Sequence, residues 1–156
     1  MKGEPRIIAV LNDALADELT AINQYMVHSE MYDNWGYERL HKAFEKIAVD
    51  EMKHAEKLIA RILFLDGQPI VSELRKFRIG ANVEAMLQND HANELGAVKT
   101  YNEAIALAVE LADNGTRELV QAILKDEEGH VDFEEAQFDQ IAQMGVQAYL
   151  AEQTKV

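Results

Sequence analysis

Two Glu-x-x-His motifs are the residues of this chain best suited to chemistry. Residues 50–56 read DEMKHAE and residues 126–132 read DEEGHVD, so Glu51 and His54 have the same spacing as Glu127 and His130. Positions i and i+3 lie about 60° apart around an α-helix, so each pair projects from one helix face. A carboxylate and an imidazole on the same face can bind a transition-metal ion together.

Two further glutamates extend this pattern into an internal repeat. Residues 18–25 read ELTAINQY and residues 94–101 read ELGAVKTY. The offset of 76 positions between Glu18 and Glu94 also separates the two Glu-x-x-His motifs. The chain is therefore expected to contain two related helical hairpins about a pseudo-twofold axis. Each hairpin would supply one Glu helix and one Glu-x-x-His helix.

All four glutamates fall among apolar residues at helical spacing, which predicts that they are buried together. Four buried carboxylates without counter-charge would be costly, and two Fe²⁺ ions would balance them. Oxygen-rich ligation with two imidazoles suits iron or manganese better than copper, and hard carboxylates favour the ferric state. The repeat thus predicts a di-iron site that oxidises Fe²⁺ with dioxygen or peroxide. The alternative is a structural helical protein with an accidental Glu/His pattern.

Four long amphipathic helices must position these residues, and their apolar stripes follow helical periodicity. The stripes are Ile8, Leu11, Leu15, Leu19, Ile22 and Met26; Leu40, Phe44, Ile47, Glu51, His54, Leu58, Ile62 and Leu65; Val83, Leu87, Glu94, Val98, Tyr101 and Ile105; and Val120, Ile123, Glu127, His130, Phe133 or Glu134, Phe138 and Ile141. Helix ends are expected at Trp35-Gly36, Asp66-Gly67, before Asp113-Asn114-Gly115, and at Gly145. A short fifth helix would follow at about 146–152.

One connection is much longer than the others. The segment from Gly67 to about Ala81 contains Pro69 and Gly80 and connects the second helix to the third. A simple up-down bundle would not need so long a connection. The chain is therefore predicted to be all-α, a single domain over 1–156 with the ferritin-like topology, in which one long crossover joins helices 2 and 3.

Composition excludes several other classes. The 156 residues include no cysteine, so disulfides and Cys-ligated metal sites are ruled out. A formal net charge of −13 argues against nucleic acid as a partner and suits cations. The sequence has no apolar run long enough for a membrane span and no secretory signal, so we expect no membrane partner and a cytoplasmic location.

Other side chains should surround the metal ligands. Asp50 and Asp126 each precede a motif histidine by four residues and could hold an imidazole within or across helices. Pairing of such an aspartate with a nearby lysine such as Lys53 is the alternative. Tyr25 and Tyr101 each follow a ligand glutamate by two helical turns. They should flank the site, where they could orient carboxylates or give an electron, although Tyr101 could also be an ordinary core tyrosine.

These residues together resemble the bacterioferritins over nearly the whole chain. The resemblance rests on ADELTAINQY (16–25), DEMKHAEKLIARILFLDGQP (50–69), the LGAV segment after Glu94 and DEEGHVDFEE (126–135). It implies a 24-subunit shell, built from dimers, that stores ferric mineral and has a di-iron ferroxidase site in each subunit. It also implies that Glu51 and Glu127 bridge the two irons of that site and that a ferredoxin-type reductant releases the stored iron. The six ligands it implies are Glu18, Glu51, His54, Glu94, Glu127 and His130.

The resemblance also implies a haem b shared by two subunits, with Met52 of each as an axial ligand. Met52 is about 100° from Glu51 around the helix, so it should point out of the bundle, and a thioether can bind haem iron. By the same resemblance Ile22, Asn23 and Met26 would line this interface. The alternative for Met52 is a plain apolar contact between subunits.

Some positions depart from the family pattern. Lys46 and Ile47 stand where many relatives have a histidine and a glutamate, and Phe44 replaces a polar residue. These changes leave the six ligands intact but put the usual inner-surface iron site in doubt. His28, His41 and His91 are expected to be ordinary surface or interface histidines. A cage-free di-iron oxidase or a rubrerythrin-like peroxidase is the rival function, although the missing cysteines disfavour a rubrerythrin.

Overall fold

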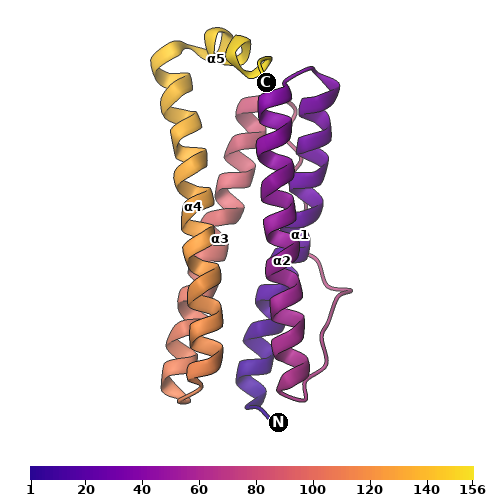
Figure 1. Ribbon diagram of the computed structural model, residues 1–156, viewed down its shortest axis with the longest axis vertical. Helices are drawn as coiled ribbons and strands as arrows, with labels where there is room; N and C mark the ends of the chain where they lie inside the picture. The colour runs from indigo at the N-terminus through magenta and orange to yellow at the C-terminus, as the bar shows by residue number, and fades with distance from the viewer.

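Five α-helices and no strands make up the chain, which the computed structural model describes from residue 1 to residue 156. The helices are α1 (Pro5–Asn34), α2 (Glu38–Phe64), α3 (Val83–Glu110), α4 (Asn114–Met144) and α5 (Val146–Gln153). The first four run side by side, and α5 lies across one end of the bundle (Figure 1). The predicted four-helix bundle with a long crossover and a short fifth helix is confirmed.

Two of the four predicted helix ends use glycine in the predicted way. Gly36 and Gly145 both have φ 81°, a left-handed conformation that glycine adopts without steric cost. After α2 and α3 the left-handed residues are instead Asp66 (φ 58°) and Ala112 (φ 55°). The neighbouring Gly67 permits close packing, because a Cβ there would lie 2.8 Å from Cγ2 of Ile8.

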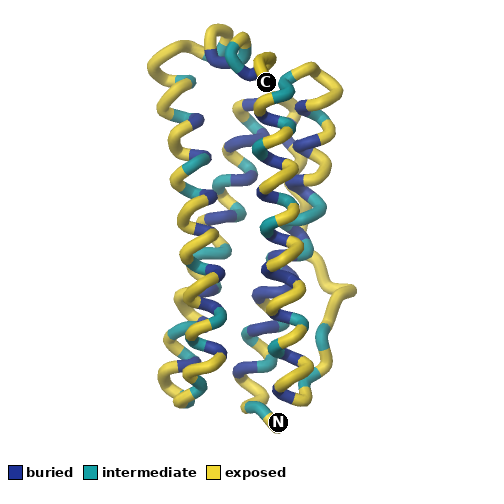
Figure 2. The backbone as a smooth tube through the Cα atoms, viewed as in Figure 1, coloured by how far each residue is buried: buried dark blue, intermediate teal, exposed yellow.

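Burial follows the inner sides of the helices, as Figure 2 shows. Every predicted inward position of α2, from Leu40 to Ile62, is buried, and so is Leu65 just after the helix. The prediction for α1 was partly wrong, because Met26 is 50% exposed and the larger buried side chains near it belong to Tyr25 and Tyr32. On α4 the choice left open between two residues is decided, since Glu134 is buried and Phe133 is only partly covered.

The crossover, residues 65–82, runs beside the bundle as an extended strap (Figure 1). Polar side chains that recur at multiples of four positions along α1 accept hydrogen bonds from backbone N–H groups of the strap. The pairs are Asn12 with Ile70, Thr20 with Arg75, Gln24 with Arg78 and His28 with Gly80. This ladder satisfies strap donors that have no helix or sheet partner. None of the helices combines the length and apolar character needed to cross a membrane.

His28 does not lie on the surface, so that prediction was wrong. Its imidazole is fully buried between α1 and α3, with Nδ1 2.8 Å from a carboxylate oxygen of Asp90. Because Nε2 accepts the N–H of Gly80, Nδ1 is the nitrogen that donates to Asp90. His28 thus fastens the end of the strap to the bundle. His41 and His91 are partly exposed, as expected.

Candidate metal centre

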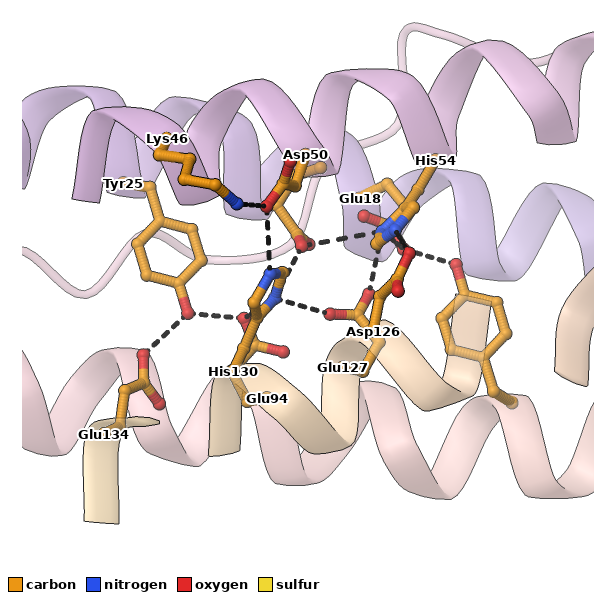
Figure 3. A network of polar contacts seen from close by, with 12 residues as sticks. Glu18, Tyr25, Lys46, Asp50, His54, Glu94, Asp126, Glu127, His130 and Glu134 are labelled. Carbon is orange, nitrogen blue, oxygen red and sulfur yellow. Dashed lines mark hydrogen bonds and ion pairs between the residues drawn. The ribbon is translucent and has the colours of Figure 1, made fainter. Parts of the chain in front are cut away.

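Four helices bring the six predicted ligands to one place near the middle of the bundle. Glu18 comes from α1 and Glu94 from α3, while α2 and α4 each supply a Glu-x-x-His pair. All six side chains are buried, and His130 is the most exposed of them at 8%. Figure 3 shows the labelled ligands converging from opposite sides of the bundle. The structure therefore juxtaposes every residue that the repeat singled out.

The cluster is arranged as two overlapping groups of four ligands. One group is Glu18, Glu51, His54 and Glu127, and the other is Glu51, Glu94, Glu127 and His130. Within each group, one ligand atom from every residue lies within 4.8 Å of the others. Glu51 and Glu127 belong to both groups, so each can bridge two cations while one glutamate and one histidine complete each position. This geometry suits a dinuclear carboxylate centre of the kind found in helical bundles.

Each histidine turns Nδ1 toward the cluster and Nε2 away from it. Nδ1 of His54 lies 3.4 Å from Glu127 and 3.6 Å from both Glu18 and Glu51. Nδ1 of His130 lies 3.0 Å from Glu51 and 3.1 Å from Glu127. Nδ1 is therefore the atom that each imidazole offers to a metal.

The predicted aspartate partners face the histidines across helices, and Asp126 is within hydrogen-bond distance of His54. Nε2 of His54 on α2 lies 3.0 Å from Asp126 on α4, and Nε2 of His130 on α4 lies 3.6 Å from Asp50 on α2. An acceptor on Nε2 orients the ring and favours metal binding through Nδ1. The alternative, pairing of an aspartate with a nearby lysine, also occurs: Asp50 contacts Lys46 Nζ at 3.0 Å, although not Lys53.

Burial and mutual repulsion govern the charges of the metal-free cluster. Burial and then the charges of Glu18 and Glu94 raise the pKa of Glu127 to about 8, and burial raises the pKa of Glu51. Burial alone would lower the pKa of His54, but contacts with Glu127 and Glu18 outweigh it and raise the value to about 11. The pKa of His130 is raised to about 10 against the same opposing effect. Whenever no cation is bound, the cluster therefore holds protons that offset its negative charge.

Unsatisfied polar atoms at the cluster fit a cation. Oε2 of Glu18, Oε2 of Glu94, Oε1 of Glu127 and Nδ1 of His54 are buried and make no hydrogen bond. Leaving buried polar atoms without partners is costly, and metal–ligand bonds would satisfy them. The donors are four carboxylates and two imidazoles, a set that suits iron or manganese.

The two tyrosines contact the ligand glutamates crosswise. Tyr25 on α1 donates to Oε1 of Glu94 on α3 at 2.5 Å, while Tyr101 on α3 donates to Oε1 of Glu18 on α1. Both rings are buried, so Tyr101 is at once a core residue and a partner of a predicted ligand. Sequence analysis did not assign a role to Glu134, whose Oε1 lies 2.8 Å from the Tyr25 hydroxyl oxygen. The available sequence signal was its spacing, because Glu134 lies four residues after His130 and so falls on the same helix face.

Two cavities reach the cluster from different sides. The first, about 340 Å³, is lined by Glu18, Glu51 and Glu94 and opens beneath the strap. Arg75 of the strap also lines it and forms ion pairs with Asp13 and Asp17. The second, about 380 Å³, is lined only by Lys46, Asp50, Lys125, Asp126, Gly129 and His130. Both cavities are therefore lined mainly by polar or charged residues, and each includes ligand residues of the cluster.

The residues assigned to haem by resemblance lie on α1 and α2. Met52 is 43% exposed and Met26 is 50% exposed, while Ile22 and Asn23 are partly buried. Met26 also borders an apolar hollow of about 410 Å³ together with Val27, Glu30, Met31 and Asn34. The outward direction expected for Met52 thus agrees with its exposure. It takes no part in the buried cluster.

The fold and the cluster define a helical-bundle protein with a buried carboxylate–histidine cluster that could hold metal ions. Residues 8–144 match the family of ferritin-like domains. The chain is 43% identical over 149 residues to a bacterioferritin of Brucella melitensis biotype 1 and 41% identical over 149 residues to one of Rhodobacter capsulatus. Each alignment covers 96% of this chain and 92% of the relative.

A bacterioferritin of Mycolicibacterium paratuberculosis is 40% identical over 152 residues, which cover 97% of this chain and 96% of the relative. These similarities extend over almost the full length of both partners, so they include all four long helices. The chain belongs to the bacterioferritin family.

Proposed function

We propose that this protein stores iron and oxidises Fe²⁺ at the buried cluster. The observation that carries this proposal is the pair of four-ligand groups that share Glu51 and Glu127. Two ions held by common carboxylates can lose electrons to one oxidant molecule together. The six ligands are Glu18, Glu51, His54, Glu94, Glu127 and His130.

The reaction balances with iron as the substrate. Two Fe²⁺ ions each lose one electron, and dioxygen takes both electrons with two protons to leave as hydrogen peroxide. With peroxide as the oxidant, the same two electrons and two protons give two water molecules. Carboxylate oxygens stabilise Fe³⁺ more than Fe²⁺, so the ligand set favours the oxidised product.

The chain's own residues prepare this reaction. Asp126 and Asp50 hold the two imidazoles with Nδ1 facing the ions, and the protons stored on His54 and His130 leave as Fe²⁺ arrives. Tyr25 is within hydrogen-bond distance of Glu94, so it can orient that ligand and supply an electron to the oxidised centre.

Storage of ferric mineral requires an enclosed space, which a single four-helix bundle does not provide. We propose a shell of 24 subunits assembled from dimers, as the family resemblance implies, with ferric mineral inside and a ferredoxin-type protein as reductant for release. Exposed apolar side chains such as Met26, Val27 and Met52 support burial of the α1/α2 face against another subunit.

The same face supports a haem b site at the subunit interface. Met52 would supply the axial thioether, and Ile22, Asn23 and Met26 would line the haem; a bound haem would provide an electron route. The exposed thioether of Met52 and the apolar hollow beside Met26 fit such a group. We expect Met52→Leu to lose the haem absorption bands without slowing Fe²⁺ oxidation. A normal haem spectrum in this variant would rule out Met52 as a ligand.

At the position that the resemblance assigns to an inner-surface iron site, this chain has an ion pair between Lys46 and Asp50. Lys46 contacts Asp50, and together with His130 it lowers the pKa of that carboxyl despite partial burial, which acts in the opposite direction. A lysine ammonium has no lone pair for a metal and occupies the carboxylate that would bind one. We therefore propose that iron passes this surface without a lasting site at Lys46.

An anaerobic Fe²⁺ titration followed by air exposure tests the function. We expect saturation at about two ions per chain, rapid growth of near-ultraviolet absorbance on oxidation, and a large hollow particle by mass. Two ions bound in a monomer or dimer would instead favour a cage-free di-iron oxidase or peroxidase. Absence of iron binding at micromolar Fe²⁺ would leave only a structural helical protein.

A further inference from the structure

The hydroxyl group of Tyr25 has more partners than it has protons. Its oxygen lies 2.5 Å from Oε1 of Glu94 and 2.8 Å from Oε1 of Glu134. A phenol has one proton to donate, so only one of these carboxyl groups can accept it. The other contact is stable only if that second carboxyl group is itself protonated and donates to the Tyr25 oxygen.

Glu134 is the carboxyl group that carries the proton. Glu94 faces a cation, because Nδ1 of His130 lies 3.4 Å from its Oε1. Glu134 is fully buried, forms no ion pair, and its Oε2 has no hydrogen-bond partner. Burial, followed by the charges of Glu94 and Asp90, accordingly raises the pKa of Glu134 to about 10. Figure 3 shows the Tyr25 hydroxyl in contact with both carboxyl groups. With the proton on Glu134, the hydrogen bonds run from Glu134 to Tyr25 and from Tyr25 to Glu94.

The other half of the centre lacks this acid. The offset of 76 positions that relates Glu18 to Glu94 also relates Tyr25 to Tyr101, and it relates Leu58 to Glu134. Tyr101 donates to Glu18 just as Tyr25 donates to Glu94, but Leu58 is apolar and cannot reinforce that bond. The two halves of the repeat can therefore be compared directly, because one has a buried acid at this position and the other has leucine.

We propose that Glu134 is a positioning residue that acts through Tyr25 on Glu94 and makes the two cation positions unequal. This inference rests on the proposed function of the cluster. A hydrogen bond received by Tyr25 polarises its O–H group and strengthens the bond that it donates to Glu94. A carboxylate that accepts a stronger hydrogen bond gives less charge to its cation. The Glu94/His130 position is therefore weakened relative to the Glu18/His54 position.

Titration with Co²⁺ under anaerobic conditions measures the two positions by their visible absorption. Glu134→Leu copies Leu58 of the other half, and we expect it to change the ratio of the two Co²⁺ dissociation constants by about threefold. The Glu94/His130 position should become tighter. Glu134→Gln is the matched control: its amide still donates to Tyr25, so the ratio should stay at the wild-type value.

A second background tests whether the effect passes through Tyr25. In Tyr25→Phe protein the route from Glu134 to Glu94 is broken, so adding Glu134→Leu should leave the Co²⁺ ratio unchanged. An effect of equal size with and without the Tyr25 hydroxyl would overturn the proposal, as would equal effects of leucine and glutamine at position 134. Circular dichroism of each variant checks that the bundle is intact.

The outcomes separate this inference from the proposed function. Two Co²⁺ ions per chain with the same ratio in wild type and Glu134→Leu would reject the role of Glu134 alone. No Co²⁺ binding by the wild-type protein would reject the dinuclear centre itself, and with it the proposed ferroxidase.

Discussion

The two halves of the proposed metal centre have the same ligand types but different surroundings. Glu18 and His54 form one half with Tyr101, and Glu94 and His130 form the other with Tyr25. Around the first half, position 58 is leucine; around the second, the related position is the buried acid Glu134.

The aspartates behind the two imidazoles differ as well. Asp126, which contacts His54, has no cation other than the imidazole within ion-pair distance, whereas Asp50, near His130, is also paired with Lys46. The metal demands the same donors in both halves, so the repeat is strict at the ligands. Residues that act only through other residues are free to diverge, and such divergence can make chemically similar positions unequal.

The largest effect is expected from removing a ligand that both halves of the centre share. Because Glu127 belongs to both ligand groups, Glu127→Ala should reduce the initial rate of Fe²⁺ oxidation by at least about 100-fold. Stopped-flow absorbance measures this rate, and far-ultraviolet circular dichroism reports helicity, which should survive. Glu128→Ala, an exposed neighbour on the same helix, is the control and should oxidise iron normally. An unchanged rate for Glu127→Ala would refute the assignment of the cluster as the site of oxidation.

Single histidine variants should separate the halves. His54→Ala removes the imidazole of one position and His130→Ala that of the other, so each variant should bind about one Fe²⁺ tightly instead of two. Paired electron loss needs both ions, and both variants should therefore lose rapid oxidation. Anaerobic titration gives the stoichiometry directly. If both variants still bound two ions with wild-type affinity, the imidazoles would not be ligands.

Cation binding should displace the protons that the metal-free centre holds. The pKa values of His54 and His130, raised to about 11 and about 10, keep both imidazoles protonated near neutral pH until a metal arrives. Zn²⁺ binding should release about one proton or more per ion, and affinity should fall as pH is lowered from about 8 to 6. Calorimetry in buffers of different ionisation enthalpy counts these protons. Binding without proton release would contradict the charge state described for the empty cluster.

The smallest expected effect is on the pH dependence of folding stability, and it arises from Glu134 in the Glu94/His130 half. Glu134 faces Tyr25 from α1, Glu94 and Asp90 from α3, and His130 on its own helix. Its folded pKa of about 10 lies above its unfolded value, so it favours folding at low pH, and this contribution is lost as pH rises toward 10. The Tm of the metal-free wild type should fall more steeply between about pH 6 and pH 9 than that of Glu134→Gln.

Glu128→Gln serves as the exposed control for this last comparison. It removes one carboxyl group from the same helix without changing the buried network, so its Tm profile should parallel the wild type. Parallel profiles for all three proteins would mean that Glu134 is ionised in the folded state.

Much of the fold could be predicted because the spacing of apolar residues along each helix defines its buried face. The inward face of α2 was predicted residue by residue, since apolar side chains and ligands alternate there at three- and four-residue steps. On α1 the prediction was less accurate, because an exposed apolar face and a polar ladder under the strap both interrupt the simple pattern. His28 shows the limit clearly: a histidine looks like a surface residue until its partners Asp90 and Gly80, from distant parts of the chain, are known.

The amino-acid sequence by itself determined the helices, the repeat and the residue types that gather at the centre, because each depends on spacing along one helix. Tertiary structure alone decided which aspartate holds which imidazole and which tyrosine contacts which glutamate, since those pairs cross between helices. It also decided that Glu134 meets Tyr25, a contact between residues 109 positions apart. Helix periodicity says which face a side chain takes, but only packing says what lies opposite it.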